Sequence, residues 1–591
     1  MKKSIIFGSL ALAGIAFTGC DDFLDDNRNP LTSEVNTPAF WNNETNVQNE
    51  ANLFYNSIIG YGNYCSRVSS TTTSVQGEFY FKTLSDDQVG RTWGLQNWAN
   101  TNVPASAASW SDPYYNIRQA MYIIEGMKTS TLDEATKNHY TAIARLNRAL
   151  QTFDLVKKYG NVFWVDQLLT INDDGFLYSA PTDRDIVMDN VLADLDFAIA
   201  NIKNESGKFE FSKDMARAAK AEICLFEGTY CKYRTEAENG KKADETRAKK
   251  YLEECVKACE PLMTRYTLTS NYLDIYQTTD VGAFGKVSEI IFGKAFKVNI
   301  MMHQLVAYTC SSTEIMGISK DAFDSYLFKD GKPLALTSCD KTDLGVLNTV
   351  DSVLSIQNLL DVRDERLAKT TDPYAYVNHL KWSRAGAAEM VSTTGYGVAK
   401  YDNITVPLYN RQTIGQNYTC GPIYWLSAVY CEFAEAKAEL GTLSDADLNN
   451  SLNKLYERAG LPAQTVASLS SMNDPANNMN VNSLIWEVRR CRRCELIMDR
   501  DFRYWDLIRW HQLDKLDNTQ YPNVFLGANF SNTFLFTEDK FINEKDAVKL
   551  NSEGYKDGGL GDRVYDKKYY FYPIPSGQIA LNDKIKQNPG W

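Results

Sequence analysis

The sequence predicts a mostly α-helical protein, a scaffold of degenerate helical repeats with a large irregular, loop-rich insertion. Three observations carry this prediction. Apolar residues recur at helical spacing in the first half and in the last third of the chain. Two neighbouring helix starts, Ser212 and Thr246, are 34 residues apart. The segment 265–420 is rich in Gly, Thr, Asn, Asp and Tyr and has weak periodicity, which indicates loops, short strands and small helices.

The first strong helix opens at a capping box, Thr131-Leu-Asp-Glu134. It ends at Gly160, after two lysines in the last turn, as helix ends prefer. Apolar residues at helical spacing place one face against a core. They are Ile143, Leu146, Leu150, Phe153 and Val156.

Three further helix starts follow, at Thr182, at Ser212 and at Thr246. The last two starts are 34 residues apart, the period of tetratricopeptide repeats, whereas the earlier starts are spaced more widely. The helix after Ser212 is rich in alanine, which allows a neighbouring helix to approach closely. We therefore expect a degenerate tetratricopeptide-like scaffold.

Helices return after the irregular region, at about 426–440, 448–459 and 483–500. The last is strongly basic, and its arginines resemble a nucleic-acid surface at first sight. Acidic residues interleave with them, however, which favours an internal network of salt bridges between helices. The residues concerned are Arg489, Arg490, Arg492 and Arg493, with Glu487, Glu495, Asp499, Asp501 and Asp506.

The N-terminus is typical of an exported, lipid-anchored protein. Residues 1–19 carry two lysines, a short apolar run and the small pair Thr18-Gly19, the order of parts in a signal peptide. Cys20 follows directly, as in a bacterial lipobox, and is the predicted lipidation site. We expect the polar segment 20–38 to be a flexible tether. The remaining divisions that we predict are 39–264 (N-terminal helical-repeat region), 265–420 (irregular region) and 421–591 (C-terminal region).

The composition and the motifs of the chain exclude several classes of function. The net charge of −12 argues against nucleic acid and anionic lipid surfaces as partners. The 12 cysteines show no regular spacing, and several lie in helical patterns, so we expect most of them to be free thiols in the core. The four histidines have no metal-ligand spacing, and we find no phosphate loop or nucleophile elbow. No catalytic residue, metal site or cofactor is predicted.

Four ordered segments give the chain a specific resemblance. They are the lipobox with its acidic followers, Arg148-Ala149 through Tyr159-Gly160-Asn161-Val162, Trp486-Glu487 through Trp510, and Tyr572-Pro573-Ile574-Pro575 with Gln587-Asn588-Pro589-Gly590-Trp591. Together they resemble the SusD/RagB family of outer-membrane nutrient-binding lipoproteins over essentially the whole mature chain. One departure is Met498-Asp499-Arg500-Asp501, where the family usually carries a Glu-Gly pair.

The resemblance implies an α-helical fold on four tetratricopeptide-like units. It also implies a lipid-anchored protein on the outer face of the outer membrane. Such a protein acts as a hinged lid over a TonB-dependent barrel of the SusC/RagA type and catches an oligosaccharide, or in some members a peptide, for import. No enzymatic step and no cofactor are implied.

The predicted ligand site lies on a turn-rich segment, where rings and planar polar groups suit a sugar. Its candidates are Arg91, Trp93, Asn97 and Trp98. Further candidates in the irregular region are Tyr272, Tyr276 and Phe296.

Three other functions stay open at this point. The chain could bind peptides, it could be a surface glycoside hydrolase with two acids flanking the scissile bond, or it could be a helical-repeat scaffold for other proteins. The sequence does not identify the glycan, the partner transporter or a bound calcium ion.

Overall fold

The computed structural model describes residues 38–58, 85–90, 102–309, 316–341, 346–347, 354–375, 392–533, 550–557 and 561–591. Long helices dominate it and confirm the predicted fold class. They are α6 (Ala108–Thr129), α7 (Glu134–Tyr159), α9 (Arg184–Asn201), α10 (Lys213–Tyr233), α12 (Glu245–Arg265), α20 (Leu426–Glu439) and α24 (Ser483–Glu495).

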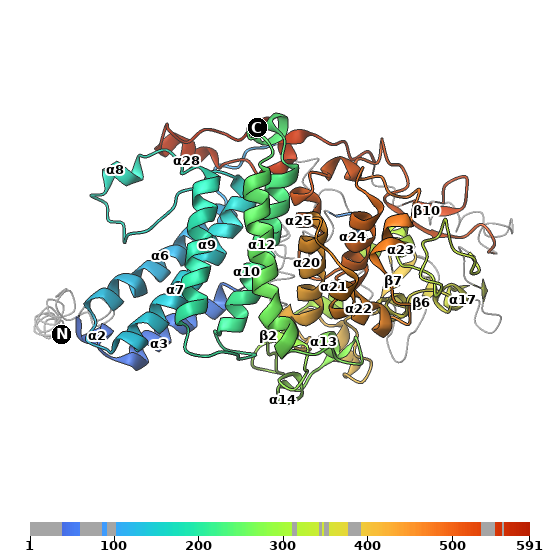
Figure 1. The fold of residues 1–591 in the computed structure, drawn as a ribbon, viewed down its shortest axis with the longest axis horizontal. Helices are drawn as coiled ribbons and strands as arrows, with labels where there is room; N and C mark the ends of the chain where they lie inside the picture. The colour runs from blue at the N-terminus through green and yellow to red at the C-terminus, as the bar shows by residue number, and fades with distance from the viewer. Residues whose placement is uncertain are drawn as a thin grey trace, which may run out of the picture.

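The long helices pack in sequence order. Helix α6 lies on α7, α7 on α9, α9 on α10 and α10 on α12. Helix α12 then contacts α20, which contacts α24. Figure 1 shows this succession running from α6 at the left to α24 at the right. The result is a layered array of antiparallel helices whose core lies between neighbouring pairs.

Short helices join and cover this array. They are α2 (Pro38–Trp41), α3 (Glu44–Asn52), η2 (Leu53–Asn56), α8 (Asp174–Leu177), α11 (Glu236–Asn239), α13 (Asp274–Gln277), α14 (Val281–Phe284), α15 (Leu305–Thr309), α16 (Lys320–Asp324), α17 (Gln357–Leu360), α18 (Glu365–Thr370), α19 (Leu408–Gln412), α21 (Asp445–Asn450), α22 (Leu452–Arg458), α23 (Val466–Ser471), α25 (Phe502–Arg509), η4 (Leu513–Leu516), η6 (Lys567–Tyr570) and α28 (Ser576–Leu581).

The strands are few and short, and their pairings are antiparallel. Strand β1 (Gln88–Gly90) pairs with β3 (Met316–Ile318), β2 (Ile290–Lys294) with β8 (Gly421–Trp425), and β9 (Leu526–Asn529) with β10 (Tyr555–Asp557). A four-stranded sheet has the order β4 (Val346–Leu347), β5 (Leu354–Ser355), β6 (Thr371–Ala375) and β7 (Tyr396–Val398).

Six of the ten described strands and seven of the short helices lie between 265 and 420, as the weak periodicity of that region predicts. Strand β2 near its start meets β8 just after its end, with Ile290 opposite Trp425. The irregular region therefore leaves the helical array and returns to it at the same place. The domain boundaries themselves remain predictions.

Side-chain caps explain where the helices begin. Ser212 caps α10 as predicted, because its hydroxyl accepts a hydrogen bond from the Met215 amide at 3.2 Å. The predicted capping box at Thr131 is wrong by two residues. Asp133 caps α7 instead, accepting from the Thr136 amide at 3.0 Å. A carboxylate near the positive end of the helix dipole outcompetes the threonine hydroxyl.

The basic helix α24 is an internal element, which confirms the salt-bridge interpretation. Arg489, Arg490 and Arg492 are at most 6% exposed, and Arg493 is partly buried. Each of the four has an acidic partner. Arg489 pairs with Glu439 at 2.9 Å, and Arg492 pairs with Asp506 at 2.9 Å. Desolvated charges need such partners, because an unpaired buried charge is costly.

The cysteines within the described part of the chain are free thiols, and all but Cys339 are buried. This confirms the expectation of core thiols for those residues. Among the helices that the structure describes, none combines the length and the apolar character that crossing a membrane requires.

Candidate ligand-binding cavity

Four of the predicted site residues, Arg91, Trp93, Asn97 and Trp98, lie outside the described residues, as does Cys20. The segment just before them is described. Its residues 85–90 are all buried and include strand β1, so this part is a core strand and not an open loop.

The three predicted rings of the irregular region are core residues, which corrects their assignment to the site. Tyr272 and Tyr276 are 0% exposed and Phe296 is 1% exposed. The Tyr272 hydroxyl donates to the Glu495 carbonyl at 2.9 Å, and the Tyr276 hydroxyl donates to Asp499 at 2.7 Å. Since these tyrosines anchor the end of α24, they have no face for a ligand.

A large cavity is lined by residues of α24 and β10, two elements that Figure 1 shows at the right of the molecule. Its volume is about 780 Å³, within the usual range for ligand sites. We call it the C-terminal cavity. Its walls come from α16, the loop after it, the 474–479 turn, α24, the 515–526 segment and β10.

Three half-buried rings from sequence-distant elements line the C-terminal cavity: Trp486, Tyr521 and Tyr555. Each has a cation on one ring face. Arg490 lies 5.4 Å from the Trp486 ring centre, Lys515 lies 4.6 Å from that of Tyr521, and Lys320 lies 5.2 Å from that of Tyr555. Such cation–π contacts hold a ring in position.

Planar amides stand beside these rings. Asn478, Gln520 and Asn523 line the cavity and are exposed. Each amide can donate and accept hydrogen bonds. Rings and amides that share one concave surface can stack on an apolar face and bind hydroxyl groups at the same time.

The inner wall of the C-terminal cavity is a rigid network of ion pairs. Arg493 donates to Asp87 at 2.8 Å and to Asp321 at 2.7 Å. Arg503 makes two bonds of 2.6 Å to Asp86. These contacts tie α24 and α25 to the residues that precede β1, so the wall is fixed before any ligand arrives.

The two neighbouring aspartates of this wall have opposite pKa shifts. Burial alone raises the pKa of Asp86, but the charges of Arg493 and Arg503 outweigh it and hold that pKa well below its usual range. Burial also raises the pKa of Asp87, and here Arg493 does not compensate, since the charge of Asp86 adds to the effect. Asp86 is therefore the stable anion of the pair.

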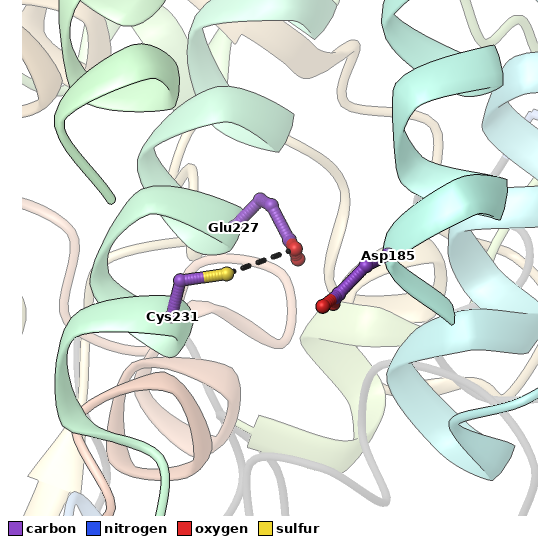
Figure 2. Close-up of side chains that lie close together, drawn as sticks. All are labelled: Asp185, Glu227 and Cys231. Carbon is purple, nitrogen blue, oxygen red and sulfur yellow. Dashed lines mark hydrogen bonds between the residues drawn. The ribbon is translucent and has the colours of Figure 1, made fainter. Parts of the chain in front are cut away.

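A second cluster offers metal-ligand atoms. Asp185, Glu227 and Cys231 bring one ligand atom each to within 4.8 Å of one another, and Figure 2 shows them between α9 and α10. The Cys231 thiol donates to Glu227 at 3.1 Å. Burial and the charge of Glu227 raise the pKa of Cys231 well above its usual range, so the sulfur keeps its proton.

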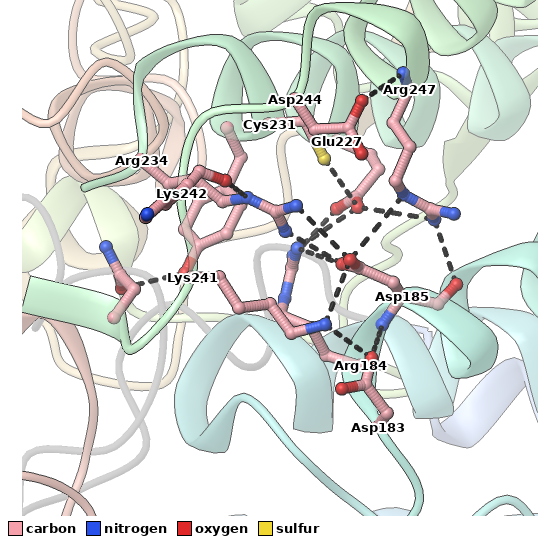
Figure 3. Close-up of polar contacts among 12 residues, drawn as sticks. Asp183, Arg184, Asp185, Glu227, Cys231, Arg234, Lys241, Lys242, Asp244 and Arg247 are labelled. Atoms are coloured by element: carbon pink, nitrogen blue, oxygen red, sulfur yellow. Dashed lines mark hydrogen bonds and ion pairs between the residues drawn. The ribbon is translucent and has the colours of Figure 1, made fainter. Parts of the chain in front are cut away.

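Cations already occupy the oxygens of this cluster. Arg184 makes two hydrogen bonds to Glu227, at 3.1 and 2.7 Å, and Arg234 makes two to Asp185, at 2.8 and 3.2 Å. Figure 3 shows Lys241 and Arg247 directed at the same carboxylate of Asp185, at 2.9 and 3.8 Å. A protonated thiol and paired carboxylates do not suit a metal ion. The cluster joins α9, α10 and the start of α12 as a structural ion-pair network.

Sequence reasoning missed the rings of the C-terminal cavity. Trp486 lies near the start of the predicted basic helix. It precedes Arg490 by four residues, so the two side chains share one helix face. That spacing could have indicated Trp486 as a candidate ligand-binding ring. Tyr521 and Tyr555 lie in loop-like sequence with no periodic signal, and only the fold brings them to α24.

Comparison with known proteins supports the resemblance seen in the sequence. The model of the SusD family matches residues 311–591. A search of curated proteins gives no match.

Solved structures match nearly the whole chain. A SusD-like carbohydrate-binding protein from Bacteroides fragilis superposes with a TM-score of 0.68 at 19% identity, covering 93% of this chain and 100% of that one. A second SusD-like protein from the same species gives 0.65 at 20%, covering 94% and 99%. A surface glycan-binding protein from Bacteroides fluxus gives 0.58 at 14%, covering 93% and 100%.

At such low identity these structures establish the fold, and the match over 311–591 includes two of the segments that carry the sequence resemblance, 486–510 and 572–591. The shared fold extends across both the helical-repeat half and the irregular region. Residues 311–591 match the SusD family, and the chain has the fold of SusD-like proteins.

Proposed function

We propose that this protein binds a glycan in the C-terminal cavity, without chemical conversion. The observation that carries the proposal is the combination in one cavity of three ring faces, Trp486, Tyr521 and Tyr555, with exposed amides. A sugar ring stacks its C–H face on an aromatic ring while its hydroxyl groups bind planar polar side chains.

The expected affinity is moderate. A sugar face that covers about 100 Å² of an aromatic ring contributes about 2–3 kcal/mol at the usual area coefficient, before the cost of ordering the ligand. Two or three rings then give roughly millimolar to micromolar dissociation constants. Such binding is strong enough to collect a nutrient and weak enough to release it.

The relatives point the same way. One is described as a carbohydrate-binding protein and another as a surface glycan-binding protein. Because they share the fold at less than 20% identity, their ligands do not transfer directly, and the nature of the glycan has to be measured on this chain.

For cellular placement, we propose a lipid anchor on Cys20 and a position on the outer face of the outer membrane. Two or more acyl chains anchor a protein stably, whereas one binds only marginally. There the protein would serve as the lid of a SusC-like, TonB-dependent transporter. Purification from outer membranes in mild detergent tests this partnership, and recovery of the lipoprotein without any large barrel protein would contradict it.

Calorimetric titration of the purified protein with panels of oligosaccharides and peptides tests the ligand class. We expect heat from at least one oligosaccharide and its loss, by tenfold or more in affinity, in both Trp486→Ala and Tyr521→Ala. Tyr409→Ala is the matched control, since this tyrosine on α19 is 65% exposed and does not line the cavity. Binding of peptides alone, or equal affinities in all variants, would contradict the proposal.

A further inference from the structure

A second cavity lies in the other half of the molecule, between the first half of α6, the 163–177 segment and α28, at the left of Figure 1. Its volume is about 600 Å³. We call it the α6 cavity. It shares no lining residue with the C-terminal cavity.

The lining of the α6 cavity is mostly apolar. Four aromatic rings and six aliphatic side chains contribute to it. They are Trp110, Tyr114, Phe163 and Phe176, with Met121, Val165, Leu168, Leu169, Ile171 and Leu177. Two of the aliphatic side chains are exposed, Ile171 at 89% and Leu177 at 40%. The apolar surface therefore continues out of the cavity onto its rim.

The segment that forms the outer wall is fixed by side-chain hydrogen bonds. The Phe163 amide donates to the Tyr114 hydroxyl at 2.9 Å. The Asn582 amide group donates to the carbonyls of Leu177 at 3.2 Å and Ser179 at 2.7 Å. Both ends of the wall are thus tied to α6 and to the end of α28, and the cavity exists before a ligand binds.

Charge distinguishes the two cavities. Acidic and basic side chains line the C-terminal cavity together, whereas Arg118 is the one charged residue among those that line the α6 cavity. Arg118 is exposed and donates to the Leu169 carbonyl at 2.6 Å and to the Tyr122 hydroxyl at 3.2 Å. These two neutral acceptors hold its guanidinium at the wall.

Arg118 has no carboxylate within ion-pair distance in the part of the chain that the structure describes. No carboxylate among the described residues therefore neutralises its positive charge. A guanidinium prefers a carboxylate, which it binds through charge-assisted hydrogen bonds. An apolar cavity with one unneutralised cation is complementary to a molecule with an apolar body and one anionic end.

We propose that the α6 cavity is a second binding site, for a small carboxylate with an apolar body, held by Arg118 at its charged end and by the ring and aliphatic wall along its length. Fatty acids and aromatic acids share this chemistry. The site is independent of the proposed glycan site, because the two cavities have no residue in common.

Calorimetric titration with two pairs of probes tests the proposal: octanoate against octanol, and 4-hydroxycinnamate against its amide. We expect one carboxylate per protein and at least tenfold weaker binding of the neutral member of that pair. Whichever pair binds identifies the body as aliphatic or aromatic. Binding of neither carboxylate at millimolar concentration, or equal binding of the charged and neutral members, would overturn the proposal.

Variants locate the site. Arg118→Gln should weaken carboxylate binding about tenfold and leave binding of the neutral probe within twofold. Leu168→Trp, which fills the cavity, should abolish binding of both, and its thermal unfolding shows whether it has folded. Lys249→Gln is the charge control, on the exposed face of α12 with a side chain 69% exposed. Carboxylate binding that survives both cavity variants lies elsewhere and would refute the assignment.

The same variants separate this inference from the proposed function. Oligosaccharide affinity should not change in Arg118→Gln. A protein that binds oligosaccharides and no carboxylate refutes the α6 site alone, and one that binds carboxylates and no oligosaccharide refutes the glycan proposal alone.

Discussion

Asp86 accepts two hydrogen bonds from Arg503, one from Nε and one from Nη2, each 2.6 Å long. The two residues are 417 positions apart in the chain, and the Asp86 side chain is 4% exposed. This bidentate pair fastens the residues before β1 to helix α25, next to the C-terminal cavity. It connects an N-terminal and a C-terminal segment of the described chain.

Removing one partner of the Asp86–Arg503 ion pair should destabilise the protein. Arg503→Gln leaves the buried Asp86 carboxylate with Arg493 alone, at 3.3 Å. Breaking a buried pair costs about 3–5 kcal/mol, because an uncompensated charge remains. Urea unfolding measures the loss. The double variant with Asp86→Asn should recover part of it, and strictly additive losses would show that the pair is not coupled.

Close packing between α10 and α12 should make Gly228 sensitive to a single methyl group. A Cβ at this position would lie 2.7 Å from Leu252 Cγ and 3.1 Å from the Leu252 backbone nitrogen. We expect Gly228→Ala to cost about 1–3 kcal/mol through overpacking, measured by thermal or urea unfolding. Gly175→Ala is the control, since nothing lies within 4 Å of its Cβ position, and a similar loss there would contradict the explanation.

The helical part of this fold was predictable because local signals decide it. Ser212 and the alanines after it predicted both the start of α10 and its close neighbour. The cap of α7 was misplaced because Thr131 and Asp133 compete for the same few amide groups, and sequence alone does not rank them. The irregular region had no periodic signal, so its strand pairings could not be derived from the sequence.

The candidate site was much less predictable. Tyr272 and Tyr276 lie in a segment whose composition is typical of a recognition loop. Their hydroxyl groups nevertheless donate hydrogen bonds to the end of α24 and to the turn that follows it. In that turn Met498 and Arg500 have positive φ angles of 63° and 44°. This is the place where the family usually has glycine, which adopts such angles without strain. Long-range contacts of this kind decide which rings are free to bind.

The cluster around Asp185, Glu227 and Cys231 should not bind metal ions. Its carboxylates are paired with arginine and lysine, so chelator or added zinc should leave the melting temperature unchanged within about 1 °C. Arg184→Met should instead destabilise the protein by about 3–5 kcal/mol, because Glu227 is 0% exposed and loses its bidentate partner. A melting temperature that rises with zinc in the unmodified protein would contradict this reading.

Glu432 on α20 gives the protein a buried carboxyl group without an ion-pair partner among the described residues. It is 3% exposed and lines a cavity of about 20 Å³, large enough for a water molecule. Burial raises the pKa of Glu432 to about 8. The charges of Arg492, Arg500 and Arg509 lower it in part, and that of Glu222 raises it further.

This shift predicts a pH dependence with a definite sign. The folded protein holds the Glu432 proton more tightly than the unfolded chain, whose carboxyl has a pKa of 4.5. The contribution to stability is therefore full below pH 4.5, decreases as the pH rises, and is lost above about pH 8. Between pH 6 and pH 9 the loss should be about 1–3 kcal/mol.

Glu432→Gln isolates this contribution, because glutamine keeps the shape and has no charge at any pH. Urea unfolding of both proteins from pH 6 to pH 9 should show that the variant is the more stable, by a difference that grows as the pH rises. Other buried groups affect both proteins equally and cancel in the difference. A constant difference across this range would mean that Glu432 is already ionised in the folded protein at pH 6, and would contradict the raised pKa.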